Sequence, residues 1–251
     1  MVQEKNQRLL SPVSIKDQEW PEPTTPVVSI CCITYNQEEF IRECLESLVV
    51  QRTTFPVEIL VHDDASTDNT ANIIREFEKR YPDVVKPIIQ EVNQFSQGKR
   101  VNLVYNFPRA VGAYIALCEG DDYWIDQEKL ELQVAALEKN QTCDLCFHPA
   151  LVRNHLADSE LRVICRHAEG EKIISIEDVI AGGGGFCPTA SLLFRTKVVA
   201  DIPDWVFYAP VGDFYMQVMG SMRGGALYLD REMSVYRTGL ATSWTKNKNK
   251  Y

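Results

Sequence analysis

Short apolar runs and stripes with helical spacing alternate along the first 150 residues. Continuous apolar runs are typical of strands buried on both faces of a sheet. They occur at 27–34, 57–64, 84–90, 113–122 and 143–149. After the first run, Phe40, Cys44 and Leu48 recur every four residues, which predicts one apolar helical stripe. We also expect helices at 65–81, at 101–112 with an interruption near Pro108, and at 126–139. Strands and helices in this order predict an α/β fold with a mostly parallel central sheet flanked by helices.

The pattern loosens after residue 150. We expect a short strand ending at Arg195 and two more at 225–230 and 233–237. A helix should open at Gly212-Asp213, with Phe214, Val218, Met219 and Met222 facing inward. Residues 1–26 hold four prolines and many charges, so we interpret them as an extended N-terminal arm. The predicted domain is 27–240, with halves 27–125 and 126–240, followed by a polar basic tail at 241–251.

The overall charge narrows the range of partners. The 251-residue chain has a net charge of −9, which argues against nucleic acid as its main partner. No apolar run approaches the roughly 20 residues that span a bilayer, and the first residues lack the apolar core of a signal peptide. We therefore expect a cytoplasmic protein whose eight cysteines are reduced.

Some of the cysteines could instead bind a structural zinc ion. Cys143, Cys146 and His148, with Cys165 and His167, include enough ligands for a zinc site. However, Cys143 and Cys146 lie in a predicted strand, where a three-residue offset points two side chains to opposite faces. We therefore disfavour structural zinc.

Three predicted strands end on polar residues. In such sheets a ligand lies at the carboxyl ends of the strands, so these side chains should converge on one edge. They are Thr34-Tyr35-Asn36, Asp63-Asp64 and Asp121-Asp122. Asp64 can accept a hydrogen bond from a base or ribose, and Tyr35 offers a ring for stacking. Asp121 and Asp122 are hard oxygen ligands suited to Mg²⁺ or Mn²⁺ shared with phosphate oxygens.

Three segments together resemble a known family. "VSICCITYNQEEFIRECLESLVVQ", "EILVHDDASTDNT" and "AYIALCEGDDYWIDQEKL" resemble, in order, the family 2 inverting glycosyltransferases of the GT-A fold. The resemblance covers roughly 27–240 and is of the bacterial polysaccharide-synthesis type. It implies transfer of a sugar from a nucleotide-diphosphate donor, with a UDP-sugar favoured. The acceptor would be a hydroxyl of a saccharide or lipid-linked saccharide.

The resemblance also assigns roles to particular residues. It implies that the donor's nucleotide contacts the strand ends and that a basic residue, Lys99 or Arg100, meets the diphosphate. The nucleotide-binding residues would be Thr34, Tyr35, Asn36, Glu38, Asp63, Asp64, Arg100 and Asp121. Asp64 would bind the base, Asp121 the ribose or donor sugar, and Asp122 the divalent cation, Mn²⁺ or Mg²⁺.

The catalytic base implied by the resemblance is Asp213, in "VGDFYMQ", although a helix cap would also suit an aspartate there. The family's closing strand often reads "YRxH", with the histidine near the metal. This chain has Tyr236-Arg237-Thr238-Gly239, so the histidine is missing. The third protein contact to the metal is therefore not supplied by this motif.

Several alternatives remain open from the sequence. A nucleotidyltransferase would also use carboxylates and a nucleotide, and a non-catalytic module would bind sugar or metal without turnover. Trp124 and Trp205 suit either sugar faces or the core, and the 182–185 glycine run either covers the acceptor site or is a surface linker. With a lipid-linked acceptor, the basic tail could contact the inner face of the cell membrane.

Overall fold

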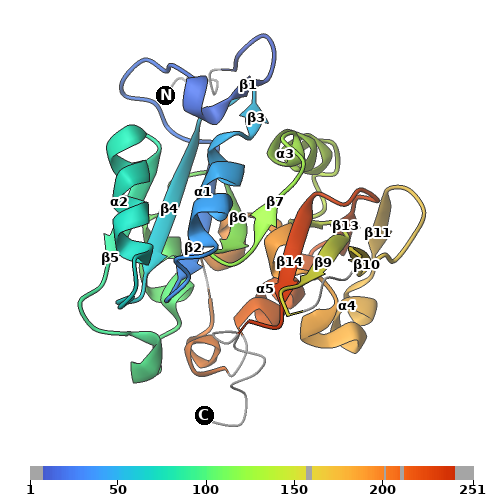
Figure 1. The fold of residues 1–251 in the computed structure, drawn as a ribbon. Helices are drawn as coiled ribbons and strands as arrows, with labels where there is room; N and C mark the ends of the chain where they lie inside the picture. Colours follow the sequence, from blue (N-terminus) through green and yellow to red (C-terminus); the bar gives the residue numbers. More distant parts are fainter. Residues whose placement is uncertain (1–7, 157–159, 201, 210–211, 241–251) are drawn as a thin grey trace.

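The strands and helices of the first half form where the apolar pattern predicts them. The computed structural model describes residues 8–156, 160–200, 202–209 and 212–240 (Figure 1). Its first long strands are β2 (Val28–Thr34), β4 (Val57–Asp63), β5 (Val85–Ile89) and β6 (Tyr114–Glu119). Three helices follow the predicted stripes: α1 (Ile41–Val49), α2 (Thr70–Arg80) and α3 (Lys129–Lys139). The predicted helix at 101–112 is a π-helix, η3 (Asn102–Asn106), followed by a 3-10 turn, η4 (Phe107–Arg109), because Pro108 lacks an amide hydrogen.

The central sheet has eight strands in the order β11-β13-β8-β12-β6-β2-β4-β5. The strands not yet given are β8 (Leu145–Phe147), β11 (Lys172–Ile174), β12 (Leu193–Arg195) and β13 (Ala226–Tyr228). From β6 to β5 every described pairing is parallel, whereas β12 is antiparallel to both β6 and β8. β5 forms one edge, which tolerates Pro87 because an edge strand need not donate on both sides. The predicted α/β class is therefore confirmed.

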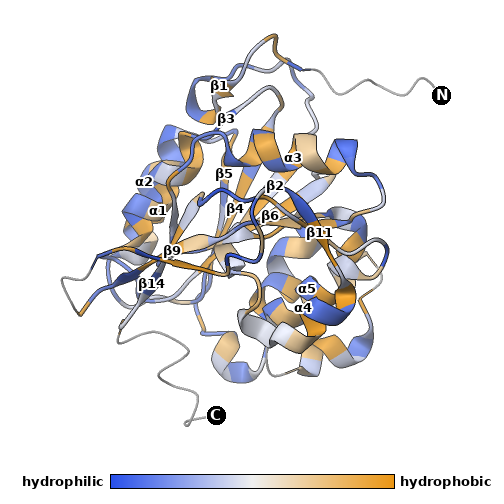
Figure 2. Cartoon of the chain, turned by 90° about the vertical axis from the view of Figure 1, so that its right-hand side faces the viewer, coloured by the Kyte–Doolittle hydropathy of each residue, from blue (hydrophilic) through white to orange (hydrophobic). Residues whose placement is uncertain are grey.

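Helices cover both faces of this sheet. One core cluster joins α1, α2 and α3 to the strands through residues such as Leu45, Ile74 and Leu137. The other lies under α4 (Ile176–Gly182) and α5 (Gly212–Ser221), with Val179 and Met216 pointing into it. Figure 2 shows α4 and α5 away from α1 and α2, with the strands between them. Both clusters contain residues from before and after residue 125, so the sheet is continuous across the predicted division into halves.

A second sheet brings distant segments together. Its order is β10 (Arg162–Ile164), β9 (Ala150–Asn154), β14 (Ser234–Thr238) and β7 (Tyr123–Trp124). In the β14–β7 pair, Ser234 lies opposite Trp124 and Val235 opposite Tyr123. The sequence pattern did not predict β9 and β10. This pairing places the end of the described chain against the acidic turn that precedes β7.

The predicted N-terminal arm packs on the domain where it is described. β1 (Val13–Ser14) pairs with β3 (Arg52–Thr53), and Ile15, in η1 (Ile15–Asp17), is buried in the first core cluster. The predicted tail at 241–251 lies outside the described residues. The remaining short helices are η2 (Phe95–Gln97), η5 (Gly183–Gly185), η6 (Thr189–Ser191), η7 (Thr196–Val199) and η8 (Asp204–Tyr208).

The structure shows which of Trp124, Trp205 and Met222 are buried in the core. Trp124 is buried and its Nε1 donates to the Ala190 carbonyl at 3.0 Å, so it has a core role. Trp205 is 54% exposed. The prediction that Met222 faces inward is wrong, because it is 69% exposed. The buried residues of α5 include Met216, Gln217 and Gly220. Met219 of the predicted stripe is partly buried against the second core cluster, whereas Met222 lies beyond the end of the helix.

The zinc alternative does not assemble. Cys143 precedes β8 rather than lying in it, and its Sγ lies 3.3 Å from the Gly224 carbonyl. His148 Nδ1 contacts the Pro149 carbonyl, and His167 Nε2 contacts the Phe186 carbonyl. Within the described residues, no group of three or more His, Cys, Asp or Glu side chains is arranged to hold a metal ion.

His62 should make the stability of the fold sensitive to acid. It lies in β4, stacks on Tyr105 and is bonded to Gln90, and burial lowers its pKa to about 4. Because the unfolded chain binds a proton at higher pH than the folded one, stability falls as pH drops below the ordinary pKa of histidine.

Chemical unfolding of wild type and His62→Gln measures this contribution. The difference in unfolding free energy between them should shrink by about 2 kcal/mol from about pH 7.5 to about pH 5. A difference that does not change with pH would mean that His62 has the same pKa in the folded protein as in the unfolded chain.

Candidate active site

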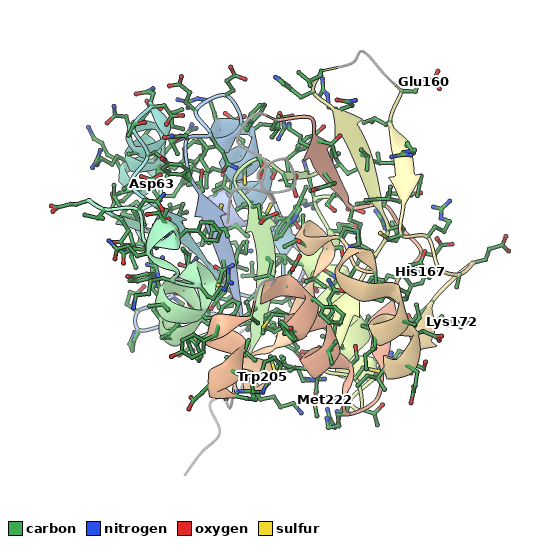
Figure 3. The ribbon with its side chains drawn as sticks, turned by 90° about the horizontal axis from the view of Figure 1, so that it is seen from below. Asp63, Glu160, His167, Lys172, Trp205 and Met222 are labelled. Atoms are coloured by element: carbon green, nitrogen blue, oxygen red, sulfur yellow. The ribbon has the colours of Figure 1, made fainter. Side chains whose placement is uncertain are left out.

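The three polar strand ends lie next to one another. Thr34 is opposite Asp63 in the β2–β4 pair, and Ile33 is opposite Glu119 in the β2–β6 pair. Backbone bonds continue past the strands, because Asp64 N donates to the Thr34 carbonyl at 3.0 Å and Gly120 N to the Ile33 carbonyl at 2.9 Å. Figure 3 views the molecule from below and labels Asp63 among these residues. The parallel sheet thus gathers the predicted carboxylates at one edge.

Asp122 has an unusual environment for a carboxylate. It is fully buried, and its Oδ1 accepts a hydrogen bond from the Arg237 amide at 2.9 Å. Its Oδ2 is also buried and has no hydrogen-bond partner among the described residues. An unsatisfied buried charge is costly unless another group pairs with it. A hard cation is a suitable partner for such an oxygen, so the residues present fit a divalent ion.

Arg237 holds the turn that carries Asp122. Its guanidinium donates to the Asp121 carbonyl and to the Glu43 carboxylate. The same group lies 4.4 Å from the centre of the Tyr123 ring and 5.0 Å from that of Phe40, within cation–π range. Only 5% of Arg237 is exposed. Sequence reasoning missed this residue because the partners come from segments far away in the chain.

The backbone at residue 239 explains why the closing strand lacks the family's histidine. Gly239 stands at that position with φ +85°, a conformation that residues with a side chain rarely adopt. A Cβ there would lie 2.6 Å from the Asn154 Oδ1. This backbone therefore disfavours a histidine at residue 239.

The acidic cluster favours protons or a cation. Burial, with the nearby charges of Asp121 and Asp213, raises the pKa of Glu119 to about 8. Burial also raises the pKa of Asp121, against the opposing effects of its own backbone amide, Arg237 and Gln37. Burial raises the pKa of Asp122 well above its ordinary range, and the charges of Asp121 and Glu119 add to this. A bound cation would oppose all three shifts by favouring the ionised carboxylates.

Asp213 faces this cluster from α5. It lies in the first turn of the helix, where the helix dipole favours a carboxylate. Its Oδ2 accepts from Thr189 Oγ1 at 3.1 Å and its Oδ1 from the Phe214 amide at 2.9 Å. One turn further on, the buried Gln217 side chain bonds to both the amide and the carbonyl of Cys187. These contacts fix α5 against the 184–189 segment. The charge of Asp213 is close enough to raise the pKa of Glu119.

Two of the predicted nucleotide contacts bind the protein itself. Asn36 has φ 51°, and its Oδ1 accepts from the Thr67 amide at 2.7 Å. Glu38 accepts from the Asn69 amide at 2.7 Å. Both tie the loop after β2 to the loop after β4. Tyr35, the first residue of the loop after β2, is 42% exposed and leaves a ring surface available.

The paired aspartates after β4 are also engaged. Asp63 accepts from the Ser66 hydroxyl and amide. Asp64 accepts from the Gln94 amide at 2.8 Å and the Phe95 amide at 2.9 Å, which fixes the loop before η3. Each carboxylate oxygen has two acceptor positions, so Asp64 retains capacity for a base. In that loop Lys99 is exposed, and Arg100 has a buried Nε without a described partner.

The glycine run at 182–185 lies beside α5. Gly182 ends α4, and η5 follows directly. Gln217 Nε2 donates to the Gly184 carbonyl at 3.3 Å. The run is therefore attached to the helix that carries Asp213.

Comparison with known proteins identifies the family. The glycosyl transferase family 2 model matches residues 29–199. The uncharacterized protein Rv1520 of Mycobacterium tuberculosis is 38% identical over 220 residues, which cover 86% of this chain and 60% of the relative. The chain therefore belongs to glycosyl transferase family 2. It spans about 60% of the length of this curated relative.

Solved structures agree on the fold. TarS 1-349 of S. aureus, in complex with UDP-GlcNAc, has a TM-score of 0.65 at 18% identity, covering 85% of this chain and 59% of that one. The mannosyltransferase PcManGT from Pyrobaculum calidifontis, with GDP-Man and Mn²⁺, has a TM-score of 0.58 at 17% identity over 88% and 59% of the two chains. The chain has the GT-A fold, as predicted. No helix in the described ranges is long and apolar enough to cross a membrane.

The acidic turn depends on Gly120, which precedes the two aspartates. A Cβ at Gly120 would lie 2.6 Å from Gln37 Oε1 and 2.7 Å from Thr34 Oγ1. We expect Gly120→Ala to destabilise the protein by about 1–3 kcal/mol, because the strand ends must separate. Gly185→Ala is the matched control, since a Cβ there meets nothing within 4 Å. Equal stability of both variants in urea unfolding would contradict this tight packing.

Proposed function

We propose that this chain is an inverting glycosyltransferase that moves a sugar from a nucleotide-diphosphate donor to an acceptor hydroxyl. The observation that carries the proposal is the buried Asp122 carboxylate, whose Oδ2 has no described partner and lies in the acidic turn next to the Asp213 helix. Family membership supports the reaction class. Neither a nucleotidyltransferase nor a non-catalytic module is favoured by any contact described above.

The donor would lie across the edge formed by β2, β4 and β6. Similar structures were solved with UDP-GlcNAc and with GDP-Man, which supports a nucleotide sugar and leaves the base to be tested. We favour a UDP-sugar. Asp64 would accept from the base, with its other acceptor positions fixing the loop at 94–95. The Tyr35 ring would stack on it, and Asp121 would bind the ribose or the donor sugar.

Asp122 would hold Mn²⁺ or Mg²⁺ together with the donor's phosphate oxygens. Such an ion neutralises charge that develops on a departing diphosphate. No group of three or more His, Cys, Asp or Glu side chains in the described part of the chain is arranged to hold a metal, so the donor would supply further ligands. Arg237 would keep Asp122 Oδ1 occupied, leaving Oδ2 for the ion.

Asp213 would act as the general base. As the acceptor oxygen forms its bond to the anomeric carbon, the bond from that carbon to the diphosphate breaks, and its electron pair leaves with the phosphate oxygen. The acceptor's hydroxyl proton passes to Asp213. Thr189 Oγ1 donates to one oxygen of Asp213 and so orients the other. Attack in line with the departing diphosphate, from the opposite face of the sugar, inverts the anomeric configuration through an oxocarbenium-like transition state.

The acceptor would be a saccharide or lipid-linked saccharide in polysaccharide synthesis, and nucleic acid is not expected to be a partner. The cytoplasmic setting remains a prediction. Contact of the 241–251 tail with the inner face of the membrane is also untested, because these residues lie outside the described ranges.

Replacing the base separates catalysis from binding. Asp213→Asn should lower transfer about 10²–10⁴-fold, because the amide cannot take the proton, while donor binding measured by calorimetry is retained. Asp178→Asn is the control, since Asp178 is also in the first turn of a helix, α4. Normal transfer by Asp213→Asn would show that another group is the base. Retained binding with no transfer by the wild type across donors and acceptors would favour the non-catalytic module.

Asp122→Asn tests the cation. Calorimetry of UDP, GDP and dTDP with and without Mn²⁺ should show one nucleotide whose binding depends on the ion. The variant should lose that dependence, because a neutral amide is a poor ligand for a hard cation. Asp83→Asn, at an exposed aspartate, should behave as wild type. Mn²⁺-dependent binding that survives in Asp122→Asn would contradict the assigned ligand.

A further inference from the structure

Three large apolar side chains are exposed on η8 and directly after α5. Trp205 is 54% exposed, Tyr208 85% and Met222 69%. Trp205 packs edge-to-face against Tyr215 of α5, with ring centroids 4.9 Å apart, so its ring contacts the helix. Figure 3 labels Trp205 and Met222 at the same edge of the molecule, away from Asp63. We call Trp205, Tyr208 and Met222 the Trp205 face.

A cavity of about 610 Å³ lies beside the turn that follows α5. Its lining includes Arg223, the residue after Met222, and also Arg195, Thr196 and Lys197. These residues come from β12, from η7 and from the turn after α5. Helix α5 itself packs against both η7 and η8. Because Met222 and Arg223 are neighbours in the chain, the Trp205 face and the cavity are linked at the turn after α5.

The cavity carries an excess of positive charge. Asp144 is paired with Arg195, Lys197 and Arg223 at once, at 3.4, 2.9 and 2.7 Å. Glu138, also in the lining, is paired with Arg8. Four cations thus face two carboxylates, an excess of two on a chain whose net charge is −9. The exposed Asp204, beside Trp205, reduces this excess to one and limits the strength of any contact with an anion.

The cations differ in how freely they can meet a ligand. Arg195 is committed to the protein, since it donates to the Cys143 and Leu137 carbonyls and to the Tyr114 hydroxyl. The side chains of Lys197 and Arg223 are 51% and 46% exposed. Arg223 is also bonded to the Gln141 carbonyl. Lys197 is therefore the cation with the most freedom to meet an anion from outside.

We propose that the Trp205 face docks on an anionic lipid surface. Tyrosine and tryptophan combine an apolar ring with a polar end, which suits the boundary between headgroups and acyl chains. Lys197 and Arg223 would meet lipid phosphates at the cavity mouth. A second copy of this chain is a poorer partner, because a two-fold contact would bring the same cations face to face. A free phosphate would leave the three apolar side chains exposed.

Vesicle sedimentation of the 251-residue chain tests this docking. Binding to vesicles of phosphatidylcholine with phosphatidylglycerol should exceed binding to phosphatidylcholine alone and should weaken with salt. Lys197→Gln should reduce the partition coefficient about fivefold, the value of one cation near such a surface. Trp205→Ala should reduce it about tenfold through lost apolar burial.

Matched controls lie on another part of the surface. Lys172→Gln removes an exposed lysine from β11, and Ile180→Ser removes an apolar side chain that is 50% exposed on α4. Both should bind vesicles as wild type does. Equal binding to the two vesicle types, or equal losses in the controls, would overturn the proposal. So would a dimer in sedimentation equilibrium that Trp205→Ala abolishes, or binding of inorganic phosphate without binding of vesicles. None of these readouts depends on glycosyl transfer.

Discussion

The buried carboxylate of Asp122 is the constraint on which the site depends. One oxygen is satisfied by the amide of a residue 115 positions later in the chain, and the other has no described partner. Burial of a half-satisfied charge costs stability, so the fold must hold it from several sides. The β14–β7 pairing provides the amide, and the Arg237 guanidinium clamps the preceding carbonyl. The stability of the second sheet therefore supports the position of a single oxygen.

The surrounding charges reinforce this arrangement. Glu119 and Asp121 add further carboxylates near Asp122. Burial, with the charges of Asp121 and Asp213, raises the pKa of Glu119 to about 8. Arg237 provides one positive charge, which is shared with Glu43. A donor diphosphate would add still more negative charge. A divalent cation would relieve both sources of repulsion together, so the proposed metal and donor would bind in a linked way.

The sequence predicted those parts of the molecule whose signals are local. Apolar runs located β2, β4 and β6, and the polar residues that follow them indicated the edge where the site lies. The role of Arg237 was not predictable, because it arises from contacts with Glu43, Asp121 and two aromatic rings brought together by tertiary pairing. Asn36 and Glu38 show the converse: both follow the predicted strand end but bond to the neighbouring loop. Periodicity also misplaced Met222, because α5 ends at Ser221 and the apolar spacing gave no signal of that end.

Anomalous diffraction at the manganese edge is the most direct test of the central claim. Crystals of the chain grown with Mn²⁺ and the nucleotide that binds best should show one strong peak in contact with Asp122 Oδ2 and with phosphate oxygens of the nucleotide. The Arg237 amide should still donate to Oδ1. A nucleotide bound at the strand ends with no manganese, or with manganese remote from Asp122, would contradict the account.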